Sequence, residues 1–229
     1  MTKEEYTKQH NKLMQNWKKR DLHSGKSFGK KPVFIEDGII DFDRWSKVKR
    51  KVLFLLKEAY QKEQGDEDWS LTELIRNNWQ GPKHKVWWTV SYWLYVLQKS
   101  DKNHVPNLPR NETEFAECKE YLLSSAVVNI KKSSGRSRSV EEDLSQYLNE
   151  DKDLLYDQIA LINPDIIICG YTFEYLRVIM KTTGNEIEDS DGIVFQFDKI
   201  MAFDYWHPAN QFPEKLCYYT LGHFCQKCF

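Results

Sequence analysis

The sequence predicts an α/β protein, a three-layer α/β/α sandwich around a four-stranded, mostly parallel sheet. Two observations lead to this fold class. Four short apolar runs each end in polar residues, and continuous apolar runs of this length are typical of strands covered on both faces. Segments with helical periodicity lie between the runs, and strands that alternate with helices indicate a parallel sheet.

The elements follow one another along the chain. The four apolar runs place strands at 52–56, 126–128, 166–169 and 200–203. Helical periodicity predicts helices over about 4–20, 69–79, 83–99, 112–124, 141–161, 172–182 and 212–226. Two hairpins are also expected, one within 34–40 and one that joins 193–197 to 200–203. The aromatic stretch 86–97 has helical spacing, so we expect it to be buried against the sheet.

The length of 229 residues suits one domain with an extension. We expect a basic N-terminal extension over 1–47, because residues 1–51 contain about twice as many Lys and Arg as Asp and Glu. The α/β domain is then expected over 48–229. The net charge of −1 excludes a globally basic nucleic-acid binder but leaves room for a locally basic groove.

Several cellular settings are disfavoured by the sequence. It has no run of about 18 apolar residues, so we expect no membrane partner, and its first residues have no apolar signal-peptide core. Five cysteines is an odd number, which favours free thiols in a reducing compartment. We therefore expect a cytoplasmic protein. The sequence does not indicate any protein partner or an oligomeric state.

Candidate functional residues follow the predicted strands. In parallel α/β sheets, ligands bind beyond the carboxyl ends of the strands. The residues expected there are Glu58, Asn129, Gly170 and His207. Glu58 offers a carboxylate that orients water, Asn129 an amide that reads a base edge, and His207 a donor to an oxygen that gains negative charge. Together these groups fit cleavage of an N-glycosidic bond.

Four motifs in order give the chain a resemblance to the uracil-DNA glycosylase superfamily. They are Leu56-Lys57-Glu58-Ala59-Tyr60, Val127-Val128-Asn129-Ile130-Lys131-Lys132, Asn163-Pro164-Asp165-Ile166-Ile167-Ile168-Cys169-Gly170 and His207-Pro208-Ala209. The first is similar to the family's Gly-Glu-Ala-Pro-Gly motif, and the last to its His-Pro-Ser motif. The resemblance covers roughly residues 48–225. It implies a uracil-DNA glycosylase-like fold and hydrolysis of the bond between DNA and uracil or another modified or damaged base.

The resemblance also implies roles for individual residues. Glu58 and His207 would be the catalytic residues, and Asn129 would bond the edge of a base flipped out of the duplex. Tyr60 would form a wall of the base pocket, and Trp69 would stack on the ring. Contacts with the DNA backbone or duplex are expected from Lys131, Lys132, Ser134, Arg136, Arg138, Ala209, Asn210 and Gln211. No metal and no organic cofactor is expected, and because the first cysteine is Cys118, no iron–sulfur cluster is expected either.

The first motif departs from the family pattern and keeps alternatives open. Lys57 stands where the family has a small residue, and both glycines and the proline are missing. A non-catalytic nucleic-acid or nucleotide binding module of the same fold is therefore the main alternative. The C-terminal run with His223, Cys225 and Cys228, together with Cys217, leaves a zinc-stabilised scaffold as a third reading. The base, the strandedness of the DNA and a role in repair or defence stay open.

Overall fold

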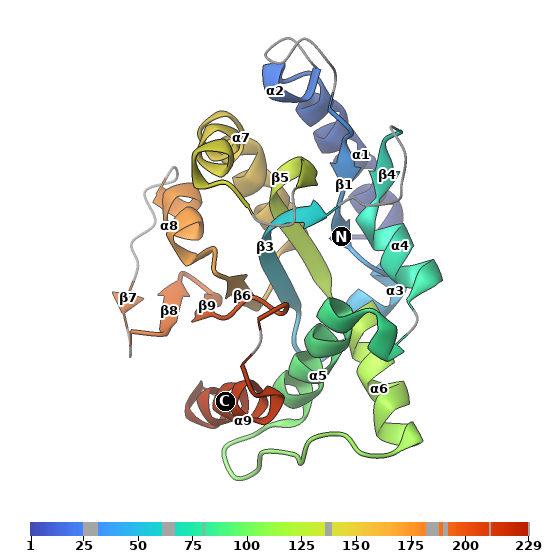
Figure 1. Ribbon diagram of the computed structural model, residues 1–229, viewed down its shortest axis with the longest axis vertical. Coiled ribbons are helices and arrows are strands. Elements are labelled where there is room, and N and C mark those ends of the chain that lie inside the picture. Colours follow the sequence, from blue (N-terminus) through green and yellow to red (C-terminus); the bar gives the residue numbers. More distant parts are fainter. Residues whose placement is uncertain are drawn as a thin grey trace.

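The protein is an α/β fold built around a mostly parallel sheet (Figure 1). The computed structural model describes residues 1–24, 32–60, 67–79, 81–135, 139–181, 188–189, 192–210 and 212–228. In the described residues, no helix combines the length and the apolar composition that a membrane span requires.

Seven strands form the main sheet, in the order β2-β5-β3-β6-β9-β8-β7. The main-sheet strands are β2 (Gly38–Ile39), β3 (Val52–Tyr60), β5 (Ala126–Gly135), β6 (Ile166–Gly170), β7 (Glu188–Asp189), β8 (Val194–Phe197) and β9 (Ile200–Tyr205), and the two others are β1 (Ile35–Glu36) and β4 (Trp69–Ser70). Strands β5, β3, β6 and β9 are parallel, whereas β2, β8 and β7 pair antiparallel at the two edges. The short β1 pairs with β4 in a separate two-stranded sheet.

Seven helices lie close to the predicted ranges, and the short helices α2 and α3 were not predicted. They are α1 (Lys3–Lys18), α2 (Asp21–Ser24), α3 (Phe42–Trp45), α4 (Leu71–Asn78), α5 (Lys85–Lys99), α6 (Glu112–Leu123), α7 (Glu141–Ile162), α8 (Phe173–Lys181) and α9 (Glu214–Cys228), with a 3₁₀ turn at Gly81–Lys83. Side-chain caps fix several starts, for example Ser70 before α4 and Asn111 before α6. The C-cap of α7, Asn163, has a left-handed φ of 51°.

The sheet is larger than the four strands expected. The four apolar runs do form its parallel centre, and the hairpin of 193–197 with 200–203 is confirmed as β8 and β9. The hairpin within 34–40 was wrong, because β1 pairs with β4 and β2 pairs with β5. The reason is Asp37 between them, whose buried side chain bonds to β5 and α7 and leaves β1 and β2 to different partners.

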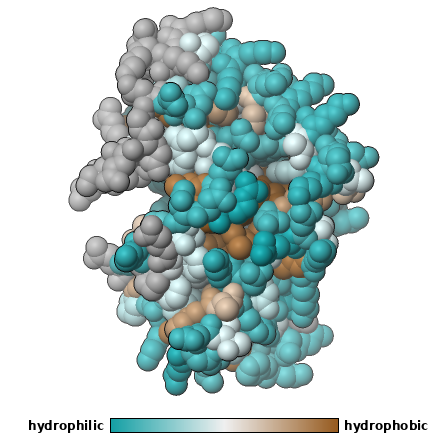
Figure 2. Space-filling model, turned by 90° about the vertical axis from the view of Figure 1, so that its right-hand side faces the viewer, coloured by the Kyte–Doolittle hydropathy of each residue, from teal (hydrophilic) through white to brown (hydrophobic). Residues whose placement is uncertain are grey.

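Helices cover both faces of the sheet and enclose two hydrophobic clusters (Figure 1). Helices α1, α7 and α8 pack on one face, and α4, α5, α6 and α9 pack on the other. Residues 90–98 of α5 are buried, and Trp87 and Trp88 are partly buried, so the expected burial of the aromatic stretch 86–97 is confirmed for its second part. On the side of the molecule shown in Figure 2, apolar atoms gather in the middle between hydrophilic ones.

The basic segment 1–47 contributes to this core. Helix α1 begins with a capping box of Thr2 and Glu5, and its Trp17 is fully buried in the same cluster as Leu55 and Val128. Strand β2 from this segment forms one edge of the main sheet. The segment therefore positions buried groups next to β5.

Candidate functional site

The carboxyl edge of the four parallel strands is where this fold class places ligands. After β3 the chain moves to β5 on one side and then to β6 on the other side of β3, so the direction of strand order reverses at β3. Glu58 lies near the end of β3, Gly170 ends β6, and His207 follows β9 by two residues. Asn129 was expected after its strand, but it lies inside β5, which continues to Gly135.

Glu58 is held in a tight site between β3 and β5. Its Oε2 lies 3.4 Å from Lys131 Nζ, and its side chain is 5% exposed. The other carboxylate oxygen, Oε1, is buried and has no hydrogen-bond partner among the described residues. A Cβ at Gly135 would lie 2.4 Å from Glu58 Cδ, so the absence of a side chain there makes room for the carboxylate.

Lys131 connects Glu58 to helix α7. Its Nζ lies 2.5 Å from Asp143 Oδ2 and 5.0 Å from the ring centre of Tyr147. The side chain of Asp143 is 33% exposed, so this part of the cluster reaches water. Next to it, Lys57 Nζ lies 3.5 Å from Glu141 Oε2. We call Lys57, Glu58, Lys131, Glu141 and Asp143 the edge cluster.

His207 lies beside Gly170, at the end of β6. A Cβ at Gly170 would meet both Leu56 Cδ2 at 2.7 Å and His207 Cα at 3.5 Å, so Gly170 leaves room for Leu56 of β3 and for the loop after β9. Burial, and secondly the positive charge of Lys57, lower the pKa of His207 from its usual 6.5. The imidazole is therefore neutral at pH 7.

The hydrogen bonding of His207 selects its tautomer. The backbone N–H of Ala209 donates to His207 Nδ1 at 3.1 Å. Because Nδ1 accepts this bond, the proton of the neutral ring is assigned to Nε2. His207 thus presents an N–H donor from Nε2.

Asn129 belongs to a different, closed cluster. Its backbone N–H and its Nδ2 donate to Asp37 Oδ2 at 2.8 and 3.2 Å. Lys132 Nζ lies 2.6 Å from Asp37 Oδ1, and Gln158 Nε2 donates to the same oxygen at 3.0 Å. Both Asp37 and Lys132 have side chains that are 0% exposed. We call Asp37, Asn129, Lys132 and Gln158 the sealed cluster.

The sealed cluster gives two predicted residues roles inside the protein. Lys132 was expected to contact a phosphate, but its ammonium group is completely buried between Asp37 and the Trp17 ring, whose centre is 4.7 Å away. Burial lowers the pKa of Lys132, and Asp37 opposes this effect. The Asn129 residue is 2% exposed, so the amide that was expected to read a base is turned to Asp37.

The other predicted residues are spread over several elements. Trp69 is partly buried in β4 and packs against the hydrophobic cluster that contains α5. Ser134 is partly buried near the end of β5, and Ala209 is exposed in the loop after β9. Only the backbone of Tyr60 is described. Arg136, Arg138 and Gln211 lie outside the described residues, so their predicted roles stay predictions.

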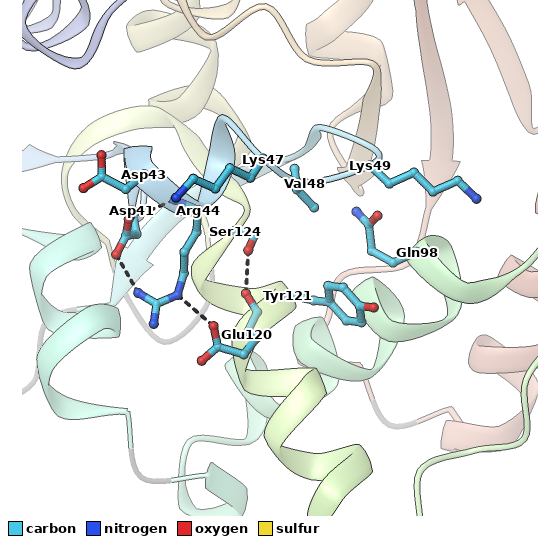
Figure 3. A pocket seen from close by; sticks show the side chains of 10 residues that line it. All are labelled: Asp41, Asp43, Arg44, Lys47, Val48, Lys49, Gln98, Glu120, Tyr121 and Ser124. Atoms are coloured by element: carbon cyan, nitrogen blue, oxygen red, sulfur yellow. Dashed lines mark hydrogen bonds and ion pairs between the residues drawn. The ribbon is translucent and has the colours of Figure 1, made fainter.

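Two pockets can be compared with the predicted site. A pocket of about 390 Å³ adjoins the His207 loop, between the first turns of α5 and α9, and includes Asn210. A pocket of about 690 Å³ lies at the opposite, amino edge of the sheet, between the loop before β3 and the end of α6 (Figure 3). There Arg44 donates to both Asp41 and Glu120. The larger pocket is therefore not at the predicted site.

The cysteines of α9 are mostly buried. Cys217 and Cys225 are buried, and Cys228 is partly buried. Burial raises the pKa of Cys217, and it raises that of Cys225 to about 12. Within the described part of the chain, no three His, Cys, Asp or Glu side chains are grouped as metal ligands would be.

No protein-family model matches the sequence, and no curated protein matches it. The function is therefore inferred from the site itself.

Sequence reasoning missed Asp37, the residue on which the sealed cluster converges. It lies before Gly38, which has a φ of 147°, and Asp-Gly is a common turn pair. No local signal distinguishes a buried aspartate from one in a solvated turn. The pocket residues Trp88 and Trp93 were expected in the core, and the periodicity that indicates burial does not indicate the pocket beside them.

Proposed function

We propose that this protein is a DNA glycosylase-like hydrolase that acts on the N-glycosidic bond of uracil or another modified base. The proposal includes a uracil-DNA glycosylase-like arrangement of the fold, with the site at the carboxyl edge of β3, β6 and β9. The observation that carries it is the state of His207, a neutral imidazole whose Nε2–H is assigned as a donor.

His207 would act on the leaving base. When the bond between the sugar C1′ and the base nitrogen breaks, the electron pair goes to the base and negative charge develops on its carbonyl oxygen. A neutral N–H donor stabilises this charge without first giving up a proton. The lowered pKa of His207 keeps this donor neutral at pH 7.

Glu58 would act on the sugar and on water. Its buried Oε1 lacks a partner among the described residues, and such an oxygen suits a bound water. The carboxylate would stabilise the positive charge on the sugar and accept the proton of the water that bonds to C1′. Lys131 Nζ, 3.4 Å from Oε2, would hold the carboxylate in place.

The test uses duplex oligonucleotides that contain uracil, hypoxanthine or modified cytosines, followed by alkaline cleavage of abasic product. We expect release of at least one of these bases, and a rate loss of about 10²–10⁴-fold for Glu58→Gln. For His207→Ala we expect a loss of about 10²–10³-fold. The matched control is Glu142→Gln, an exposed glutamate of α7. No abasic product from any substrate, or a rate unchanged in both site variants, would overturn the proposal.

A second candidate is a binding module of the same fold that does not cleave. It is favoured by Asn129, whose amide donates to Asp37 instead of facing an open site. In this case a band shift with modified DNA appears without abasic product. Asn129→Ala then lowers stability and leaves the base preference of binding unchanged.

A further inference from the structure

The pocket beside the His207 loop has walls made largely of aromatic side chains. Its volume of about 390 Å³ falls in the range of small-molecule pockets. Trp88, Trp93 and Phe212 line it, together with Pro208 and the first residues of α5 and α9. The pocket adjoins the proposed active site but is formed by other residues. A ligand bound there would therefore be additional to the substrate of the proposed hydrolase.

The Trp88 ring is held in place by three other rings. Trp79 stacks on it with 5.9 Å between ring centres, and Tyr92 and Phe115 contact it at 4.8 and 5.5 Å. Trp88 itself is only partly buried and lines the pocket, so part of its surface remains open to a ligand. This side of the pocket is therefore a pre-formed aromatic wall.

Phe212 supplies a second and more exposed ring. It is 49% exposed, and its ring centre lies 5.3 Å from that of Trp206. The faces of aromatic rings carry negative electrostatic potential, so they attract cations, and Trp attracts them most strongly. Two such rings in one pocket favour a ligand that is positively charged and partly apolar.

A carboxylate lies in the same pocket. Glu214, the first residue of α9, lines it, and burial raises the pKa of its carboxyl group. Burial, and next the charge of Glu214, raise the pKa of Tyr92 in α5, so the carboxylate lies close to the ring cluster around Trp88. Among the described residues, none forms an ion pair with Glu214. The pocket thus combines aromatic faces with an unpaired negative charge.

Lys85, the first residue of α5, also lines the pocket but does not neutralise this charge. In the described part of the chain no ion pair joins it to Glu214, and burial is the one cause that raises the Glu214 pKa. Lys85 is exposed, so its ammonium group can stay in water. The carboxylate is left in a partly desolvated place, where a positive partner stabilises it more than it would in open water.

We propose that this pocket binds a quaternary ammonium group. The cation would lie against the rings of Trp88 and Phe212, with its charge next to the Glu214 carboxylate. A quaternary nitrogen has no N–H donors, so no hydrogen bond is left unmade when its methyl groups enter an aromatic site. The inference goes beyond the proposed hydrolase and does not depend on it.

The same chemical group occurs in choline and in trimethylated lysine side chains, so the experiment uses both sources. Titration calorimetry measures binding of choline, and of a short peptide with one trimethyllysine, to the full chain at about pH 8, where carboxylates are ionised. The matched ligands are the uncharged analogue of choline with carbon in place of nitrogen, and the same peptide with unmodified lysine. We expect at least one cation to bind with saturation, about tenfold or more tightly than its matched ligand.

Two variants remove the recognition groups one at a time. Glu214→Gln removes the charge at nearly constant size and is expected to weaken binding about tenfold. Phe212→Leu keeps an apolar side chain without the aromatic face and is expected to weaken binding about fivefold. Their controls, Glu142→Gln and Tyr156→Leu in α7, should leave the affinity unchanged. Circular dichroism checks that each variant keeps its fold.

A further variant tests the sign of the charge effect. Lys85→Gln removes a positive charge from the pocket, so the affinity for the cation should stay the same or rise. A weaker affinity in this variant would show that the pocket prefers an anion, and it would overturn the inference.

The remaining outcomes are equally distinct. Saturable binding of either cation supports the pocket and identifies the source of the group. No saturable binding of either up to about 10 mM, equal binding of the matched ligands, or an affinity unchanged in Glu214→Gln or Phe212→Leu would overturn the inference. Choline binding by a protein that releases no base from DNA would leave this inference standing while the hydrolase proposal fails.

Discussion

Two neighbouring lysines of β5 lie in very different surroundings. Lys132 belongs to the sealed cluster, where both partners of the ion pair with Asp37 are 0% exposed. Lys131 belongs to the edge cluster, where its partner Asp143 is 33% exposed. Lys131 bonds Asp143 in the first turn of α7, whereas Lys132 lies on Asp37 and the Trp17 ring, so one step along the chain separates a place near the carboxyl edge from an internal role.

The difference separates structural charges from charges available to a ligand. The two charges of a completely buried ion pair have no contact with water, so each is stabilised only by the protein groups around it. Removal of one charged side chain therefore leaves the other charge buried and uncompensated. The edge cluster retains contact with water and holds an unpartnered oxygen, Glu58 Oε1. We expect changes in the sealed cluster to act mainly on stability and changes in the edge cluster mainly on function.

The largest effect is expected for Lys132→Met. The variant leaves Asp37 buried without its cation, and the expected loss is about 3–5 kcal/mol in the free energy of unfolding. Urea denaturation measures it, with Lys131→Met as the comparison, for which we expect a smaller loss. The double variant Asp37→Leu/Lys132→Met should recover part of the loss. Equal losses for the two lysines would contradict the distinction between the clusters.

A smaller effect on stability, with a larger one on function, is expected for Gly135→Ala. The new Cβ would lie 2.4 Å from Glu58 Cδ and Cγ, so the carboxylate has to move. We expect about 1–3 kcal/mol of destabilisation by overpacking. We also expect a loss of cleavage of about tenfold or more, since Glu58 is displaced. Parallel urea and cleavage assays check this, with exposed Ser139→Ala as the control, and unchanged cleavage would remove Glu58 from the mechanism.

The smallest expected effect is the change in stability and cleavage with pH that comes from His207. Its pKa is lowered by burial and by Lys57, so the folded protein takes up this proton less readily than the unfolded chain. Stability from this group is present above pH 6.5 and is lost as the pH falls from 6.5 through the folded-state pKa. Cleavage should likewise persist below pH 6.5 until the imidazole is protonated.

The variant Lys57→Gln tests the second cause of the lowered His207 pKa, the positive charge of Lys57. Removal of the positive charge should raise the His207 pKa towards 6.5 by less than about one unit, since burial is the larger cause and stays. An NMR titration of the ring protons measures the shift, with exposed Lys215→Gln as the control. A pKa at or above 6.5 in the wild-type protein would contradict the neutral donor.

Much of the fold was predictable because local periodicity carries it. The four apolar runs became the parallel centre of the sheet, and helices such as α5 and α7 lie within two residues of their predicted ranges. The length of β5 was missed, because polar residues such as Asn129 and Lys131 inside a strand look like the end of one. Short edge strands such as β2 give a weak local signal and depend on their partner.

The sequence by itself determined the α/β class, the order of the strands along the chain, and the placement of Glu58 and His207 near strand ends. Periodicity and apolar runs are local properties, so they can be read without coordinates. The tertiary structure alone decided that Asn129 faces Asp37, that Lys131 and Lys132 separate, and that Asn210 and Trp93 share a pocket. These features depend on contacts between residues far apart in the chain, and no local pattern specifies which buried polar groups will meet.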